Sequence, residues 1–356
     1  MITISLCMIV KNEESFIGRC LDTVNDIVDE INIIDTGSTD NTKDIALKYT
    51  NRVFDFEWVD NFSLARNFSF NKATKDYILW LDADDIFLEI DRTKLKNLKY
   101  TLDNSVDSVT FMYNYSSDEE GKPLLIFPRE RLVKRERNFK WVGYVHEYIN
   151  TYGNQVNSDI TVTHKRIHNS SYRNLNIYKK NLEYGNKLTN RDMYYYGKEL
   201  YYHRLWDESI KILELFLDTD SWFEDKIDAS CAIADCYGYK GDTLKERSTL
   251  FKALEYTVPR GEIMYRIGYS FQKDGKIDEA IFWYKTILNT EIPKTISGFI
   301  YPEYWTWKPN LQLCVCYYEL GDVDKSYYYH KKSYEANPIH ESIIANQDFF
   351  NSIECI

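Results

Sequence analysis

The chain has 356 residues, and at roughly 150 residues per domain this length predicts two domains. Hydrophobic residues make up 44% and charged residues 28% of it, a balance that excludes an intrinsically disordered chain. The formal net charge of −11 is the wrong sign for a protein that coats nucleic acid or an anionic membrane. We therefore expect a folded protein without a nucleic-acid partner.

Cysteine usage and the first residues indicate the compartment. The seven cysteines include no CxxC pair, so a disulfide framework is not expected and the thiols are predicted to pack as small hydrophobic groups. The sequence begins MITISLCMIV and continues with KNEE, which resembles neither a signal peptide nor a membrane anchor. These features predict a cytoplasmic protein with no membrane span.

The first 110 residues or so alternate short apolar runs with amphipathic stretches, which is typical of βαβ units. Strands are predicted at residues 3–10, 31–35, 52–56 and 77–82, and helices at 15–24, 39–49 and 62–73. Because the strand runs are continuously apolar, both faces of the predicted parallel sheet should be covered. The sequence thus predicts a Rossmann-like α/β domain.

From about Tyr194 onward the sequence predicts helices alone, with an internal repeat. Gly241 and Gly275 are 34 residues apart, and Gly321 repeats the turn signal after an insertion at residues 296–309. This region resembles tetratricopeptide repeats, and we expect an α/β domain at 1–175 followed by an all-α repeat domain at 176–356. Four insertion aromatics are a predicted partner surface: Tyr301, Tyr304, Trp305 and Trp307.

Acidic residues occur where two predicted strands end. Asp35 closes one strand, Asp40 follows in its loop, and the segment LDADD closes another with Asp82, Asp84 and Asp85. Ligands of open parallel sheets bind at the carboxyl ends of the strands. An extended segment places Asp82 and Asp84 on the same side, where hard oxygens suit Mg²⁺ or Mn²⁺. By composition alone, a turn or a helix cap remains the alternative to a metal site.

The segments KNEE, IIDTGSTDNT, DNFSLARNFS and LWLDADD follow in one order at domain-scale spacing. Together they resemble the inverting family 2 glycosyltransferases with a GT-A domain, closest to the repeat-tailed subgroup that includes the sublancin S-glycosyltransferase. The resemblance implies that Asp35 and backbone near Val10 hold uracil, that Asp82 contacts the ribose and that Asp84 binds a metal. Arg66 would face the base or the diphosphate. The residues assigned to UDP-sugar binding are Val10, Asn12, Glu13, Asp35, Asp40, Arg66, Asp82, Ala83, Arg129 and Arg131.

A basic segment and a histidine pair follow this domain core. Residues 129–140 carry six basic and two acidic side chains, which suit either a diphosphate or a solvated edge strand. The segment FKWVGYVHEYIN contains His146 and Glu147, and the resemblance implies Glu147 as the base that inversion requires, with His146 beside it. His164, at the end of an apolar run, is the predicted further contact of the metal or the diphosphate, and His168 is its weaker alternative.

With the acidic and basic residues described above, the resemblance implies an inverting glycosyltransferase that depends on Mn²⁺ or Mg²⁺. It would move a hexose or N-acetylhexosamine from a UDP-sugar to Ser, Thr or Cys of a peptide or protein, such as a flagellin or a bacteriocin. The repeats would present the acceptor or form a homodimer. The alternatives are a saccharide or lipid-linked acceptor, and a repeat scaffold whose sheet domain is inactive.

Overall fold

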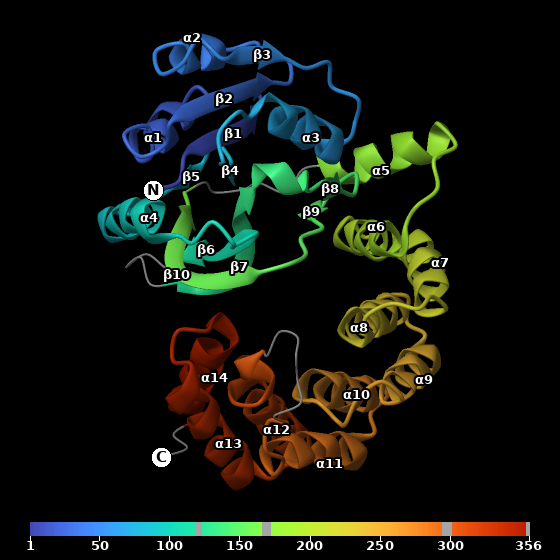
Figure 1. Ribbon diagram of the computed structural model, residues 1–356. Coiled ribbons are helices and arrows are strands. Elements are labelled where there is room, and N and C mark those ends of the chain that lie inside the picture. Colours follow the sequence, from blue (N-terminus) through green and yellow to red (C-terminus); the bar gives the residue numbers. More distant parts are fainter. Residues whose placement is uncertain (118–122, 166–171, 294–300, 354–356) are drawn as a thin grey trace. The chain divides into compact units, whose positions relative to one another are not determined.

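The computed structural model describes residues 1–117, 123–165, 172–293 and 301–353. The chain forms two compact units, Met1–Lys187 and Leu188–Ile356. The first is a mixed α/β domain and the second is helical (Figure 1), which is the fold class that the sequence predicts. The contacts divide the chain after Lys187, so the helix at Arg173–Glu183 belongs to the first unit.

Within the described residues, the first unit contains an eight-stranded sheet of order β3-β2-β1-β4-β7-β6-β10-β5 (Figure 1). Its strands are β1 (Ile4–Val10), β2 (Glu30–Asp35), β3 (Val53–Asp55), β4 (Tyr77–Trp80), β5 (Asp85–Ile86), β6 (Ser108–Ser117), β7 (Pro123–Lys134) and β10 (Gln155–His164). β1 to β4 are parallel, whereas β7 is antiparallel to both β4 and β6. β8 (Trp141–Val142) and β9 (Tyr148–Ile149) pair separately. The loops after β1, β2 and β4 therefore meet at one edge of the sheet, called the carboxyl edge below.

Helices cover both faces of the sheet, as the continuous apolar strands predict. Leu6 and Met8 of β1 pack in one core cluster with α1, α2 and α4, while Cys7 points to the opposite face and packs with α3. Tyr178 of α5 is fully buried, and its hydroxyl lies 3.4 Å from the carbonyl oxygen of Val145. The helices are α1 (Ile17–Asp22), α2 (Thr42–Ala46), α3 (Phe62–Lys72), α4 (Glu89–Thr101) and α5 (Arg173–Glu183).

Two local expectations from the sequence are wrong. β4 ends at Trp80, and Asp82 to Asp85 form a turn in which the Asp85 N–H donates to the Asp82 carbonyl at 3.1 Å. Asp82 and Asp84 therefore do not lie on an extended segment. The basic segment is not an edge strand either, because β7 lies between β4 and β6 and ends in a 3₁₀ turn at Arg135–Arg137.

The second unit is a series of helix pairs (Figure 1). Its helices are α6 (Asn190–Tyr202), α7 (Trp206–Leu217), α8 (Phe223–Tyr239), α9 (Thr243–Ala253), α10 (Gly261–Lys273), α11 (Ile277–Leu288), α12 (Trp307–Glu319), α13 (Val323–Ala336) and α14 (Glu341–Ser352), with a 3₁₀ turn at Pro302–Tyr304. In three successive pairs, a glycine lies in the turn between the two helices. These glycines are Gly241, Gly275 and Gly321, with φ of 80°, 71° and 78°. This left-handed conformation favours glycine, which explains the spaced turn signals.

Two contacts between the first two helix pairs each span 34 residues. The hydroxyl of Tyr194 donates to Asp228 at 2.8 Å, and that of Tyr201 donates to Asp235 at 3.2 Å. Each of these two contacts joins α6 to α8 across 34 residues. The rings of the same tyrosines pack against Phe216 and Trp206, so the predicted aromatic packing is present in this part of the unit.

The insertion packs partly into the repeat core. Trp305 is 9% exposed and lies against Gly261, where a Cβ atom would approach the indole to 2.8 Å. The expectation that all four insertion aromatics form a surface is therefore wrong for Trp305. Residues 294–300 of the insertion lie outside the described residues.

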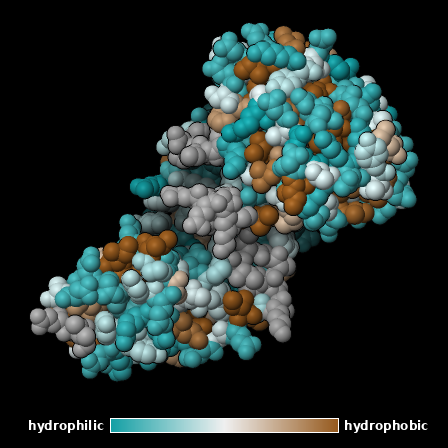
Figure 2. Space-filling model, turned by 90° about the vertical axis from the view of Figure 1, so that its left-hand side faces the viewer, coloured by the Kyte–Doolittle hydropathy of each residue, from teal (hydrophilic) through white to brown (hydrophobic). Residues whose placement is uncertain are grey.

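The surface is mixed in character. On the face in Figure 2, hydrophilic side chains predominate among the described residues and apolar ones form small scattered groups. No helix in the described part of the chain combines the length and the apolar character needed to cross a bilayer.

Candidate functional site

The loops after β1 and β2 are joined to each other at the carboxyl edge. The Asn12 side-chain oxygen accepts the Thr39 N–H at 2.8 Å. Asp40 accepts the N–H of Thr42 at 3.0 Å with one oxygen and that of Glu14 at 3.1 Å with the other. Asn12 and Asp40, both expected at the UDP-sugar, thus fix the shape of the loops.

Asp35 lies between these loops and is 2% exposed. Its Oδ2 accepts the N–H groups of Gly37 and Ser38 at 3.1 and 3.0 Å. Its Oδ1 is buried and has no hydrogen-bond partner in the described part of the chain. An unsatisfied buried carboxylate oxygen costs free energy, so this atom is placed to accept a donor from a ligand.

Val10 and Glu13 contribute to the same loops through their backbone. The Val10 carbonyl accepts the Thr36 N–H at 2.9 Å, and the Glu13 N–H donates to the Thr42 hydroxyl at 2.7 Å.

A second group, after β4, is organised by Arg66 of α3. Its Nε donates to Glu147 at 2.6 Å and its Nη2 donates to Asp82 at 2.8 Å. Burial lowers the pKa of Arg66, but the charges of Asp82 and Glu147 outweigh it and raise the pKa above its usual value. Burial raises the pKa of Asp82, but Arg66 and Arg131 reverse this and hold it well below its ordinary range. Arg66 and Asp82 are therefore both charged at neutral pH.

Asp84, Asp85 and His164 form a cluster beside this group. Each offers one ligand atom, and these atoms lie within 4.8 Å of one another. The fold brings them together because His164 ends β10 directly opposite Asp85 in β5. Burial lowers the pKa of His164, but hydrogen bonds to Asp84 and Asp85 outweigh this and raise the pKa to about 9. The two carboxylates thus attract a positive charge here, and two oxygens with one imidazole nitrogen suit Mn²⁺ or Mg²⁺ with open positions.

Two arginines of β7 lie against the indole of Trp80. Arg131 is fully buried, donates to Asp85 at 2.8 Å and stacks 3.8 Å from the Trp80 ring centroid. Arg129 is half-buried and lies 5.0 Å from the same centroid. Burial lowers the pKa of Arg129, and the neighbouring charge of Arg131 adds to this. In the described part of the chain no carboxylate pairs with Arg129, whereas Arg131 pairs with Asp85. Of the two arginines, Arg129 is therefore the one available to an anionic ligand.

The rest of the basic segment faces other partners. Arg137 makes a two-pronged pair with Asp107 at 2.6 and 2.8 Å, and Lys134 pairs with Glu136 at 2.8 Å. The segment is thus not one continuous basic surface.

Two residues that lie in this group had no role predicted from the sequence. Asp85 was seen as part of DADD but received no role, because its pairing with β10 is a tertiary contact. Tyr113, whose hydroxyl lies 3.2 Å from His164 Nδ1, carried no sequence signal. Ala83 is buried in the turn. His146 is exposed with a φ of 52°, and His168 lies outside the described residues.

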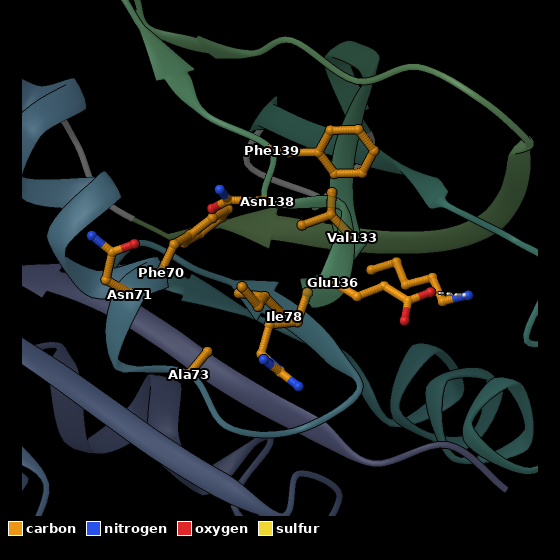
Figure 3. Close-up of a pocket in the computed structure, with 10 residues that line it drawn as sticks. Phe70, Asn71, Ala73, Ile78, Val133, Glu136, Asn138 and Phe139 are labelled. Atoms are coloured by element: carbon orange, nitrogen blue, oxygen red, sulfur yellow. Dashed lines mark ion pairs between the residues drawn. The ribbon is translucent and has the colours of Figure 1, made fainter.

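A pocket lies away from these groups, at the opposite end of β4 (Figure 3). Its volume is about 290 Å³, and Phe70, Ile78, Val133 and Phe139 supply its apolar walls. None of the residues that line it belongs to the predicted site.

The family model for glycosyl transferase family 2 matches residues 5–174, the stretch that holds every group described above. Residues 5–174 are a glycosyltransferase family 2 domain. Glycosyltransferase SunS of Bacillus subtilis is 27% identical over 244 residues, which cover 63% of this chain and 55% of SunS. A TPR repeat-containing protein of Synechococcus elongatus is 47% identical over 85 residues, 24% of this chain and 21% of that protein.

Among solved structures, MamA is 20% identical with a TM-score of 0.37, over 46% of this chain and 85% of MamA. The chain spans about half the length of SunS and about a fifth of the Synechococcus protein.

Proposed function

We propose that this protein is an inverting, metal-dependent glycosyltransferase that moves a hexose or N-acetylhexosamine from a UDP-sugar to a peptide or protein side chain. The observation that carries the proposal is the cluster of Asp84, Asp85 and His164 beside Arg66, Asp82 and Glu147, at the carboxyl edge of a family 2 domain. Buried carboxylates cost desolvation free energy, and a domain without activity has no need to keep them. This disfavours an inactive scaffold.

The donor would lie across the carboxyl edge. Asp35 Oδ1 is the proposed acceptor for the uracil N–H, since an ionised carboxylate only accepts hydrogen bonds. Asp82, about a third exposed, would accept from the ribose. The diphosphate would meet Arg129, and Asp84, Asp85 and His164 would hold the metal. A bound Mn²⁺ or Mg²⁺ would neutralise charge on the departing diphosphate.

The acceptor would react on the face of the sugar opposite the diphosphate. Glu147 would take the proton of the acceptor hydroxyl or thiol while the acceptor oxygen or sulfur bonds to the anomeric carbon. The bond from this carbon to the diphosphate breaks, and UDP leaves with the bonding electron pair. This inverts the configuration at the anomeric carbon.

The helical repeats would present the acceptor. Stacked helix pairs form extended surfaces suited to peptides, so Ser, Thr or Cys of a peptide or protein is the proposed acceptor. A homodimer through the repeats stays a prediction.

Donor turnover by the full-length protein tests the proposal. UDP-glucose and UDP-N-acetylglucosamine are incubated with Mn²⁺ or with EDTA, and released UDP is measured, with GDP-mannose as the control donor. We expect UDP release from at least one UDP-sugar that EDTA abolishes. Undiminished release in EDTA would contradict metal dependence, and release from GDP-mannose alone would contradict the uracil contact.

A further inference from the structure

Helix α3 attaches the segment that carries Glu147 to the sheet domain. The Phe62 N–H donates to the Tyr144 carbonyl at 3.0 Å, and the Ser63 hydroxyl donates to the Gly143 carbonyl. One turn later, Asn67 bonds both backbone groups of Trp141, accepting its N–H at 2.9 Å and donating to its carbonyl at 3.0 Å. The N-terminal half of α3 thus contacts residues 141, 143 and 144.

Arg66 lies at the centre of these contacts. Its guanidinium is 4.8 Å from the ring centroid of Trp80 and 4.7 Å from that of Trp141. The two indoles contact each other edge to face, at 4.8 Å between centroids. The two indoles restrict where the guanidinium can lie, so they fix the directions of its N–H groups.

Those N–H groups reach two carboxylates from different parts of the chain. Nε engages Glu147, which follows β8, and Nη2 engages Asp82, which follows β4. A buried ion pair contributes little net stability, because desolvation offsets the Coulomb attraction, yet a planar guanidinium fixes the geometry of its partners. A fixed geometry between these two carboxylates is what a reaction between donor and acceptor needs.

We propose that Arg66 is a positioning residue that holds Glu147 and Asp82 in register, and that Asn67 keeps Trp141 in place as a wall of its enclosure. Arg66 then acts through the two carboxylates without contacting the base or the diphosphate itself. This rests on the proposed function, in which Glu147 accepts the acceptor proton and Asp82 binds the ribose.

Two double-mutant cycles on the full-length protein test this inference. Arg66→Lys keeps the charge and loses the two-pronged geometry. It should lower kcat for UDP-sugar hydrolysis by about tenfold or more in the wild-type background and by less than about threefold in Glu147→Gln. It should likewise weaken UDP binding, measured by calorimetry, in the wild-type background and leave it nearly unchanged in Asp82→Asn.

If Arg66→Lys changes kcat and UDP affinity by the same factors in the wild-type and the variant backgrounds, its effect is a general structural one and the proposal is overturned. Arg137→Lys is the matched control, because Arg137 makes a similar two-pronged pair with Asp107 away from the site. It should leave both kcat and UDP affinity within about twofold of wild type. A similar loss of kcat in Arg137→Lys would also count against a specific role of Arg66.

A second variant covers the case in which Arg66→Lys does not fold, as judged by circular dichroism. Asn67→Ala removes the two bonds to Trp141 and leaves every charge in place. It should lower kcat several-fold in the wild-type background and have little further effect in Glu147→Gln; the same factor in both would overturn the proposal. If the wild-type protein turns over no UDP-sugar, the proposed function fails; if it does and Arg66→Lys matches it, only this inference fails.

Discussion

Three aspartates within four residues face three different partners. Asp82 pairs with Arg66 at 2.8 Å, Asp84 lies 3.4 Å from His164, and Asp85 pairs with the buried Arg131 at 2.8 Å. The turn causes this division, because it rotates successive carboxylates out of line with each other. From the sequence one can predict that acids gather where β4 ends, but not which partner each finds, since all three partners are distant along the chain.

Loss of the Asp84 charge should abolish turnover and leave the fold intact. Asp84→Asn keeps the shape of the side chain and removes the charge that a divalent cation needs. UDP release from a UDP-sugar in Mn²⁺ should fall by about 10²-fold or more, the scale of losing stabilisation of leaving-group charge. Asp159→Asn, at an exposed pair with Lys94, is the control and should keep wild-type release. Equal release by the two variants would remove Asp84 from the metal site.

Asp35 should matter for UDP affinity. In Asp35→Asn the side-chain oxygen still accepts the loop N–H groups, but the ionised Oδ1 proposed for the uracil N–H is gone. Calorimetry should show UDP binding weakened by about 1–3 kcal/mol, the scale of a hydrogen bond to a charged group. Unchanged affinity would place uracil elsewhere.

At the scale of elements, the positions of the first strands along the chain were largely predictable from the sequence. The order of the later strands in the sheet was not. β1 and β2 match the predicted runs to within a residue, because buried parallel strands read as continuous apolar segments. The second half of β7 is a basic segment, and only tertiary pairing shows that this strand lies between β4 and β6. The same pairing turns Arg129 and Arg131 toward Trp80, a split of the basic segment that its composition does not reveal.

Glu30, at the start of β2, should make the stability of the first unit depend on pH. Burial raises the pKa of Glu30, but hydrogen bonds from Thr74, Asn32 and Ser5 outweigh this and lower it to about 2. Because the folded pKa lies below the unfolded value of 4.5, this stabilisation is complete above pH 4.5 and is lost as pH falls toward 2. Glu30→Gln should therefore cost about 2–3 kcal/mol at pH 7, and about half of that at pH 3.

Urea unfolding of the wild-type and Glu30→Gln proteins at the two pH values measures these differences. The same difference at pH 7 and pH 3 would show that the Glu30 carboxylate contributes no charge-dependent stability.

At the scale of the whole molecule, two units with separate cores divide the proposed work. Every proposed donor contact lies in the first unit, whereas the second repeats the same glycine turn inside three successive helix pairs. The 34-residue period could be predicted from the sequence, because the left-handed turn inside each of these pairs favours glycine. The Trp305 contact with Gly261 could not, because an insertion breaks the period.

A fragment ending at Lys187 should separate donor binding from acceptor transfer. If the repeats present the acceptor, the fragment should bind UDP with nearly full-length affinity and lose transfer to a peptide. Calorimetry measures the first property and mass spectrometry the second, and a circular dichroism melt must show that the fragment is folded. A folded fragment that glycosylates the peptide at the full-length rate would contradict the role of the repeats.

The most direct test of the central claim is intact-mass spectrometry of acceptor peptides incubated with the full-length protein, a UDP-sugar and Mn²⁺. Peptides encoded by genes next to that of this protein are the first acceptors to use, and Glu147→Gln is the matched inactive variant. The account predicts a mass increase of one hexose or N-acetylhexosamine on Ser, Thr or Cys, lost in EDTA and reduced about 10²-fold or more in Glu147→Gln, because the acceptor proton then lacks its base. Transfer at the wild-type rate by Glu147→Gln, or transfer unaffected by EDTA, would contradict it.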